Sequence, residues 1–242
     1  MKINLFASSE QLNQNVVDTI VRMLPKEQQR FNFAPTGGTT PLSLYPLLIP
    51  HLRQHDNIHY YTQDEVPFHP HEQENGGIFR HIERHLFAPA GVPDERIHAL
   101  TGANYRQADQ QIINDGGIDL LLLGLGGDGH IAANLPGTPF DSEAHRIEVD
   151  RSNQDMVNAL ANEAGSKEKV PDAYFSLGLK TIMRARNIFL LVTGEKKAAI
   201  LSQALEGPLT EQVPASILRF HPSCTLFTDA GAAQQLTRLN SL

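Results

Sequence analysis

The sequence predicts an α/β fold in which helices flank a mostly parallel, doubly wound sheet, and three observations support this. Strand-like and helix-like segments alternate along the 242 residues, without an internal repeat or a long linker. Several strand-like segments are short and almost wholly apolar, as strands covered on both faces are. Glycine-rich or acidic loops follow them, where open α/β sheets bind ligands. We therefore expect residues 1–242 to form a single domain, a Rossmann-like three-layer sandwich.

The N-terminal elements are predicted from apolar runs and their boundary residues. Ile3–Phe6 is expected to be a strand, and Ser9 to cap a helix. That helix carries its apolar residues on one face, at Val16, Val17, Ile20 and Leu24. Phe31–Pro35 is a second expected strand, followed by a loop and a helix with Pro41 near its first turn.

The middle of the chain repeats the same alternation. Ile58–Thr62 is predicted to be a strand that ends at Gln63-Asp64-Glu65, and a helix is expected around Ile78–Phe87. Asp94–Leu100 is predicted to be a short strand, and Tyr105–Asn114 a helix. The apolar run Asp119–Leu125 is the expected central strand.

The C-terminal part supplies the remaining elements. Asn187–Thr193 and Cys224–Asp229 are expected strands; a helix from Glu195 to Leu205 lies between them, and a C-terminal helix follows. Residues 151–169 differ, because this segment is polar and helix-capable and lies between two buried segments. We expect it to form a mobile helical lid over the site.

Composition restricts the classes of partner and cofactor. The net charge of −7 argues against a general nucleic-acid binder, although a local nest of amides with one lysine can still hold a phosphate. Cys224 is the single cysteine, which suits a reducing cytoplasm. The N-terminal residues predict neither a signal peptide nor a membrane span. His81 and His85 have helical i,i+4 spacing without an HExxH motif, so no metal site is expected.

The segment after the central strand holds the first candidate catalytic groups. Asp128 and His130 lie among glycines where a parallel strand would end, and glycines let backbone N–H groups approach a ligand closely. An acid and an imidazole at this place are candidates for catalysis. A plain glycine turn beside an exposed histidine is the alternative interpretation.

Two further loops predict a phosphate site on the same edge of the sheet. Thr36, Gly37, Gly38, Thr39 and Thr40 combine hydroxyls and glycines with the start of a helix, which are the parts needed to bind a phosphate. An ordinary turn with a threonine N-cap is the alternative. Lys197, at the start of a helix after a buried strand, is a candidate point charge for the phosphate.

Two adjacent carboxylates follow the third predicted strand. The side chains of Asp64 and Glu65 cannot point the same way, so one of them should face the crevice. Acids in that position can move protons between carbon atoms or orient an imidazole. A solvated acidic loop is the alternative.

The order of these segments resembles the family of glucosamine-6-phosphate deaminases and 6-phosphogluconolactonases. The resemblance spans nearly the whole chain and rests on the segments TGGTTPLSLY, QDE, LGLGGDGHIAANLPGTPFDS, VTGEKKAAIL and SILRFHPSC. It implies a doubly wound α/β enzyme that acts on a phosphorylated sugar without a cofactor or a metal. In deaminases, an acid at the position of Asp64 moves a proton between carbons 2 and 1, and a histidine at the position of His130 opens the ring, grouped with the acid at Asp128.

The resemblance also adds candidates for substrate binding and shows departures. Gly129 and Thr138 are expected to contact substrate, and Glu65 and Asn134 are further candidates in the matching segments. Leu135 stands where deaminases have a glutamate that partners the histidine. The phosphate-binding arginines of deaminases have no clear counterpart, since His145 and Val157 fall near those positions, and Arg146 and Arg151 are candidate substitutes.

The leading hypothesis is an isomerase or deaminase of amino-sugar phosphates, with glucosamine 6-phosphate or a related hexosamine 6-phosphate as substrate. The alternative is a 6-phosphogluconolactonase in which His130 activates water, because Gly-Asp-Gly-His and Asp-Glu followed by Val-Pro are shared with lactonases. A non-catalytic sugar-phosphate sensor is a third interpretation. We expect a small-molecule partner, no nucleic acid or membrane, and a cytoplasmic location. The sugar epimer, homo-oligomerisation and regulation stay open.

Overall fold

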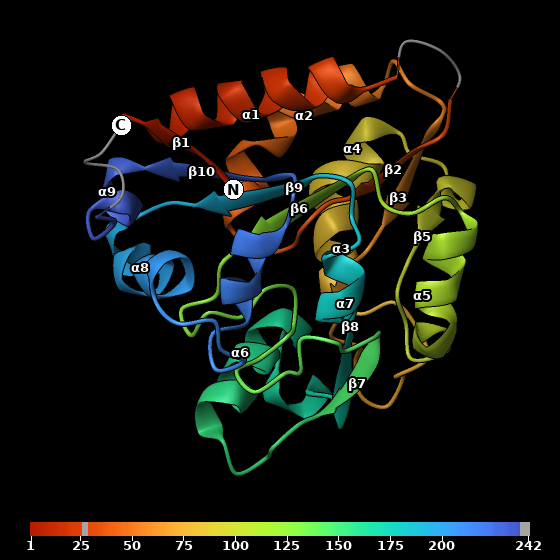
Figure 1. Cartoon of the computed structure of the whole chain (residues 1–242). Helices are drawn as coiled ribbons and strands as arrows, with labels where there is room; N and C mark the ends of the chain where they lie inside the picture. Colours follow the sequence, from red (N-terminus) through yellow and green to blue (C-terminus); the bar gives the residue numbers. More distant parts are fainter. Residues whose placement is uncertain (26–28, 238–242) are drawn as a thin grey trace.

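A seven-stranded sheet forms the centre of the structure, a computed structural model that describes residues 1–25 and 29–237 (Figure 1). The strand order is β1-β10-β9-β6-β2-β3-β5, and each of these neighbouring pairs is parallel. The strands are β1 (Lys2–Phe6), β2 (Phe31–Ala34), β3 (Ile58–Tyr61), β5 (Ile97–His98), β6 (Leu120–Gly124), β9 (Ile188–Val192) and β10 (Cys224–Asp229).

Helices cover both faces of this sheet, and the central strand shows why. Leu120 and Leu122 of β6 belong to one apolar core, whereas Leu121 and Leu123 belong to the other, because successive side chains of a strand point to opposite faces. One face is covered by α1 (Ser9–Met23), α2 (Tyr45–Leu52), α3 (Gly77–Ile82), η2 (Glu83–Phe87) and α4 (Ala88–Ala90). The other is covered by α5 (Tyr105–Asn114), α7 (Leu179–Ile182), α8 (Ala198–Glu206), η6 (Pro214–Phe220) and α9 (Ala230–Ala233). Four short 3₁₀ helices lie in the connecting segments: η1 (Thr40–Ser43), η3 (Asp94–Arg96), η4 (Lys167–Lys169) and η5 (Glu195–Lys197).

A second, three-stranded antiparallel sheet extends the molecule beyond the strand ends. Its order is β4 (Asp64–Glu65), β8 (Ala173–Ser176), β7 (His145–Glu148). Helix α6 (Gln154–Ala164) lies beside it, at the bottom of Figure 1. The small sheet therefore joins the end of β3 to the segment that carries α6.

The predicted doubly wound α/β fold is confirmed, and most elements lie within one or two residues of their expected bounds. Three details of the prediction were wrong. The N-cap of α1 is Ser8 rather than Ser9, since the Ser8 side chain accepts a hydrogen bond from the Gln11 N–H at 3.3 Å. Only Ile97–His98 of the strand predicted at 94–100 is extended, because a 3₁₀ turn occupies its first residues. The helix predicted around 78–87 changes to a π turn at Glu83.

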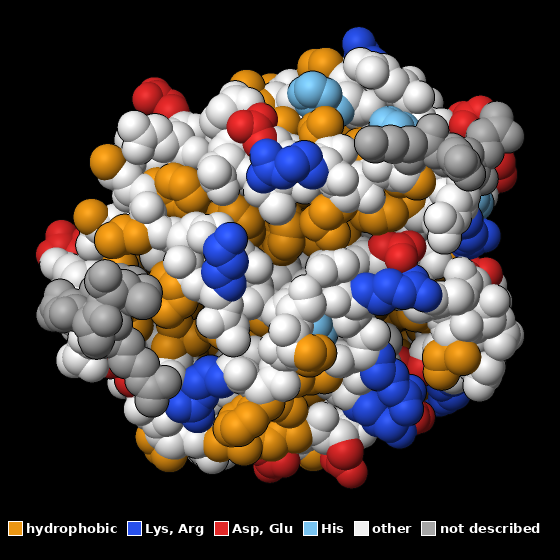
Figure 2. All heavy atoms as spheres, turned by 45° about the horizontal axis from the view of Figure 1, so that its top comes forward, with side chains coloured by type: hydrophobic (Ala, Val, Ile, Leu, Met, Phe, Trp, Pro, Cys, Tyr) orange, Lys and Arg blue, Asp and Glu red, His pale blue; other side chains and the backbone are white. Residues whose placement is uncertain are grey.

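The surface carries charges of both signs. On the face shown in Figure 2, acidic and basic side chains are spread over the surface, with apolar side chains exposed between them. Within the described residues, no helix is both long and apolar enough to cross a membrane.

Candidate active site

The loops after four parallel strands meet around one cavity. It has a volume of about 330 Å³, and its walls come from the ends of β2, β3, β6 and β9 and from α6. The lining residues are Thr36, Gly37, Gly38, Thr39, Thr40, Asp64, Ile78, Gly124, Leu125, Gly126, Gly127, His130, Ala132, Glu163 and Lys197. The structure thus brings together the threonine-glycine loop, Asp64, His130 and Lys197, as expected for ligand sites at the carboxyl ends of an open sheet.

We name this cavity the threonine-loop chamber. Its end at loop 36–40 offers hydrogen-bond donors and one cation. The loop 36–40 is fixed by Tyr45, whose hydroxyl donates to the Thr36 carbonyl at 2.5 Å. Gly38 has a φ of 79°, a conformation that favours glycine, and the turn lets backbone N–H groups reach the cavity. The Lys197 ammonium donates to the Leu125 carbonyl at 2.6 Å and keeps further N–H donors for a ligand. Burial lowers the pKa of Lys197, and the Asp128 carboxylate opposes this.

Asp64 and Glu65 point to different sides, as their adjacency requires. The side chain of Asp64 faces the cavity, and burial raises the pKa of its carboxyl to about 7; the charge of His130 opposes this shift, and the negative charge of Glu163 adds a smaller increase. Glu65 is fully buried and accepts hydrogen bonds from the N–H groups of Val66 and Ile78, both at 2.9 Å, and of Phe79 at 3.1 Å. Burial raises the pKa of Glu65, and backbone donors at Gly76, Phe79 and Ile78 oppose that shift. Glu65 therefore fixes the first turn of α3, and Asp64 is the acid available to a ligand.

His130 is held by Asp128 and by a close glycine. The Nδ1 atom of His130 lies 2.7 Å from Asp128 Oδ1, and the backbone N–H of His130 donates to the same oxygen at 3.1 Å. Because an ionised carboxylate only accepts, we assign the proton to Nδ1, which leaves Nε2 free. The bond to His130 lowers the pKa of Asp128 to about 2. A Cβ on Gly126 would lie 2.2 Å from the His130 ring, so only glycine permits this position of the imidazole.

A larger chamber of about 640 Å³ adjoins the first and shares Asp64, Ile78, His130, Ala132 and Glu163 with it. Its other lining residues are Val66, Asp128, Ala133, Leu135, Pro136, Asn153, Met156, Ala159, Leu160 and Tyr174. We name it the α6 chamber, because α6 forms one wall. Its charged side chains, among the described residues that line it, are the carboxylates of Asp64, Asp128 and Glu163; Lys and Arg do not contribute.

Glu163 is the functional candidate that the sequence analysis missed. It lies on α6 and borders both chambers, although its side chain is exposed at the surface. A Cβ on Gly77 would lie 2.4 Å from the Glu163 carbonyl, so the end of α6 packs tightly on the start of α3. The expectation of a helical lid at 151–169 pointed to this segment but gave no residue within it a role.

Several predicted substrate-binding residues do not line either chamber. Glu65 and Asn134 are buried, and the Asn134 side chain donates to the Leu177 carbonyl at 2.9 Å. The Thr138 hydroxyl donates to the Leu135 carbonyl at 2.7 Å, and a Cβ on Gly129 would lie 2.8 Å from the Val213 side chain. Gly129, Asn134 and Thr138 thus lie in the loop segment around His130, and Glu65 lies under the first turn of α3, outside the lining of both chambers.

The residues considered as replacements for the phosphate-binding arginines of deaminases also lie outside both chambers. His145 and Arg146 are on β7, where the Nδ1 atom of His145 lies 2.8 Å from the Glu143 carbonyl and Arg146 pairs with Glu148 and Glu72. Arg151 pairs with Asp172 at 2.9 Å. None of these three residues lines either chamber, and each side chain has a polar partner outside them.

A metal centre has no support in the described residues, which contain no group of three His, Cys, Asp or Glu side chains placed to hold an ion. The His81 and His85 rings lie 4.8 Å apart without a further ligand of this kind.

Comparisons with protein families, individual proteins and solved structures all point to one family. Residues 7–226 match the family described as "Glucosamine-6-phosphate isomerases/6-phosphogluconolactonase". Similar proteins include glucosamine-6-phosphate deaminases from Oceanobacillus iheyensis, 31% identical and covering 97% of this chain and 94% of the relative, and from Lactobacillus helveticus, 37% identical and covering 82% and 83%. A solved monomeric glucosamine-6-phosphate deaminase is 26% identical with a TM-score of 0.83 and covers 97% of this chain and 100% of its own. A 6-phosphogluconolactonase from Trypanosoma brucei is 21% identical with a TM-score of 0.73, covers 98% of both chains, and shows the shared fold.

Proposed function

The chain belongs to the family of glucosamine-6-phosphate isomerases and 6-phosphogluconolactonases, and from this premise we propose that it is a deaminase of hexosamine 6-phosphates. The reaction converts glucosamine 6-phosphate, or a related hexosamine 6-phosphate, to a ketose 6-phosphate with release of ammonia. The similar proteins named glucosamine-6-phosphate deaminase, at 31 to 37% identity, support this choice.

The distribution of charge across the two chambers is the observation that carries the proposal. The threonine-loop chamber provides backbone N–H donors, hydroxyls and the Lys197 ammonium, which suit a phosphate. The carboxylates of Asp64 and Glu163 lie at the boundary that the two chambers share, and the carboxylate of Asp128 lines the α6 chamber; together they suit an ammonium group. A hexosamine 6-phosphate carries both charges. A phosphogluconolactone carries only the phosphate, and its hydrolysis creates a carboxylate that these acids would repel.

The proposed mechanism gives each residue a separate task. The loop 36–40 and Lys197 hold the phosphate and so place the sugar carbons at the boundary of the chambers. The Nε2 atom of His130 transfers the proton needed to open the ring, while Asp128 fixes the imidazole. Asp64 then removes the proton from carbon 2 and returns a proton to carbon 1, which leaves an imine at carbon 2. Water adds to this imine, and ammonia leaves as the ketone forms. A carboxyl with a pKa near 7 is well suited to give and take a proton at neutral pH.

Lactone hydrolysis is the second candidate, because one observation favours it. The wall of the α6 chamber has Leu135 rather than a carboxylate near His130, so the imidazole is paired with Asp128 alone. An imidazole held in this way could activate water toward a lactone carbonyl.

Assays of both reactions on the purified protein test the proposal. We expect ammonia release from glucosamine 6-phosphate to exceed hydrolysis of 6-phosphogluconolactone in kcat/KM. A higher kcat/KM for the lactone would overturn the deaminase proposal. Binding of both sugar phosphates without turnover would instead support a non-catalytic sensor.

The remaining expectations belong to the same proposal. We propose that residues 1–242 act as one domain in which α6 serves as a lid, and that the protein works in the cytoplasm without a cofactor. The buried thiol of Cys224 is compatible with a reducing compartment.

A further inference from the structure

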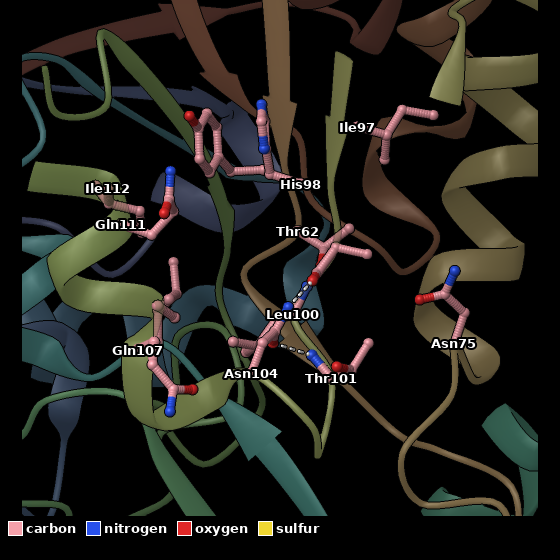
Figure 3. A pocket seen from close by; sticks show the side chains of 14 residues that line it. Thr62, Asn75, Ile97, His98, Leu100, Thr101, Asn104, Gln107, Gln111 and Ile112 are labelled. Carbon is pink, nitrogen blue, oxygen red and sulfur yellow. Dashed lines mark hydrogen bonds between the residues drawn. The ribbon is translucent and has the colours of Figure 1, made fainter. Parts of the chain in front are cut away.

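A third cavity lies apart from the substrate chambers and shares no lining residue with them (Figure 3). Its volume is about 490 Å³, within the range of small-molecule sites. It opens to the surface and is lined by the ends of β3 and β5, the loop between β5 and α5, and one face of α5. The lining residues are Tyr61, Thr62, Asn75, Ile97, His98, Ala99, Leu100, Thr101, Asn104, Gln107, Ala108, Gln111, Ile112 and Leu177.

The chemistry of this lining differs from that of the active site. Lys, Arg, Asp and Glu are absent from the described residues that line it. Burial, together with the charge of Arg30, lowers the pKa of the lining residue His98, so a phosphate, a carboxylate or an ammonium ion would find no opposite charge at neutral pH. Amide side chains face one another across the space, with Asn75 on one side and Gln107 and Gln111 on the other in Figure 3. Leu100, Ile112 and Leu177 add an apolar surface. Amides both donate and accept, and so match hydroxyl groups, which do the same.

Part of the hydrogen-bonding capacity of this lining is unused. The Thr62 side chain is only 2% exposed and accepts from the Leu100 N–H at 2.8 Å, yet its hydroxyl hydrogen has no acceptor in the parts of the chain that the structure describes. The half-buried Asn75 and the exposed Gln107 have no side-chain partner among residues 1–25 and 29–237, so both amides can turn toward a ligand. Asn104, in contrast, is fully engaged, since it accepts from the Thr101 N–H and donates to the Ala99 carbonyl, both at 2.8 Å. A buried hydroxyl with a free hydrogen favours a polar ligand next to it.

The cavity is connected to the active site through the segment that follows β3. Thr62 lines the cavity and Asp64, two residues later, lines both substrate chambers. Between them, the Gln63 side chain donates to the Pro35 carbonyl at 2.9 Å, directly before the loop 36–40. The Leu177 N–H donates to the Gln63 carbonyl at 2.7 Å, and Leu177 itself lines the cavity. A ligand that moves Thr62 or Leu177 therefore acts on the backbone that holds Asp64.

We infer that this cavity is a regulatory site for an uncharged, hydroxyl-rich small molecule of the size of an unphosphorylated sugar. Such a ligand places its hydroxyls against Thr62, Asn75 and Gln107 and its apolar face against Leu100 and Ile112. Its binding changes the affinity of the substrate chambers by fixing residues 62–64.

Methyl glucoside is a suitable probe, because it is uncharged and its ring cannot open. Saturation-transfer NMR with the full chain should show saturable binding that persists at saturating fructose 6-phosphate, even where its affinity is shifted by the coupling. Gln107→Leu and Asn75→Leu should each weaken binding about threefold or more, as expected for the loss of one hydrogen bond. Gln110→Leu is the matched control, since Gln110 is on the same helix outside the cavity and should bind the probe like the parent chain.

The effect of the probe on the substrate chambers is measured separately. The probe should change the affinity of the parent chain for fructose 6-phosphate, and this change should be smaller in Gln107→Leu. Absence of saturable binding, complete displacement by saturating fructose 6-phosphate, or equal binding by Gln107→Leu and Gln110→Leu would each overturn the inference. Binding without any change in fructose 6-phosphate affinity would overturn the coupling. Neither readout requires turnover, so failure of the proposed deaminase activity leaves this test intact.

Discussion

At the scale of single residues, the adjacent acids Asp64 and Glu65 have opposite tasks. Asp64 faces the ligand space, whereas Glu65 accepts three backbone N–H groups inside the protein. We expect Asp64→Asn to lower the rate of the proposed isomerisation about 10²–10⁴-fold, the usual contribution of a general base. The substitution removes a buried carboxyl whose charged form is disfavoured, so the stability should not fall. Steady-state kinetics and thermal unfolding measure the two effects.

Glu65→Gln provides the contrast for this experiment. It replaces a carboxylate that accepts N–H groups from Val66, Ile78 and Phe79 by an amide with one acceptor oxygen. Stability should therefore fall in Glu65→Gln and stay constant in Asp64→Asn. A loss of stability in Asp64→Asn without one in Glu65→Gln would show that Asp64, and not Glu65, is the structural acid.

The raised pKa of Asp64 predicts the pH dependence of the reaction. A base must be deprotonated, and burial places the pKa of this carboxyl at about 7. The kcat/KM should therefore fall about tenfold per pH unit below that value and level off above it. The pH profile of ammonia release measures this, and an acidic limb near pH 4 would contradict the assignment of Asp64 as the base.

Glu163 should contribute to the choice between amino and neutral sugars. Its carboxylate borders the proposed position of the substrate ammonium group but is exposed, so the attraction is screened and worth about 1 kcal/mol or less. We expect Glu163→Gln to weaken glucosamine 6-phosphate binding about two- to fivefold and to leave glucose 6-phosphate binding unchanged. Calorimetric titration of both ligands measures the difference.

Glu168→Gln is the control for Glu163. Glu168 is an exposed acid in η4, outside the lining of both chambers. Equal losses for both sugars in Glu163→Gln, or the same loss in Glu168→Gln, would remove Glu163 from the recognition of the amine.

At the scale of elements, much of the fold follows from apolar periodicity, and the parts that did not follow have physical reasons. The buried runs at β6 and β9 were predicted because strands covered on both faces need continuous apolar residues. The small sheet was missed because β4 has two residues and β7 reads His-Arg-Ile-Glu, with no such run. The convergence of Asp64, His130 and Lys197 followed from the rule for strand ends, whereas Glu163 depends on how α6 packs against Gly77, which no local pattern reports.

Gln63 joins three elements of the central sheet, and its loss should be costly. Its side chain donates to the Ala34 carbonyl of β2 at 3.2 Å, the Pro35 carbonyl at 2.9 Å and the Leu122 carbonyl of β6 at 2.6 Å. Gln63→Leu keeps a similar size but leaves buried carbonyls without this donor. We expect the free energy of unfolding to fall by about 1–3 kcal/mol, measured in urea.

Gln54→Leu is the matched comparison for Gln63→Leu. Gln54 is exposed and its side chain donates only to the Pro50 carbonyl at 3.1 Å, so its loss should have little effect. Equal stability of the two variants would show that the Gln63 bonds contribute no net stabilisation.

At the scale of the whole molecule, the sheet and α6 differ in how firmly they are held. The strands β6 and β9 lie in the middle of the sheet and are almost completely buried, whereas α6 exposes much of its surface and packs on the small sheet and α3. Local opening is easiest where few apolar contacts hold an element. We therefore predict fast amide exchange in residues 154–164 and slow exchange in β6 and β9.

A sugar phosphate in both chambers should change this pattern, because α6 forms one wall of the substrate space. If α6 closes over a bound ligand, α6 can open only after the ligand has been released. Fructose 6-phosphate at about 100 times its Kd should then slow exchange in residues 154–164 by up to about 100-fold. Inorganic phosphate, which fills only the threonine-loop chamber, should protect loop 36–40 but leave α6 unprotected. Hydrogen-exchange mass spectrometry distinguishes the two ligands, and equal exchange of α6 in the free and the sugar-bound protein would show that α6 is a fixed wall and that the substrate enters without its movement.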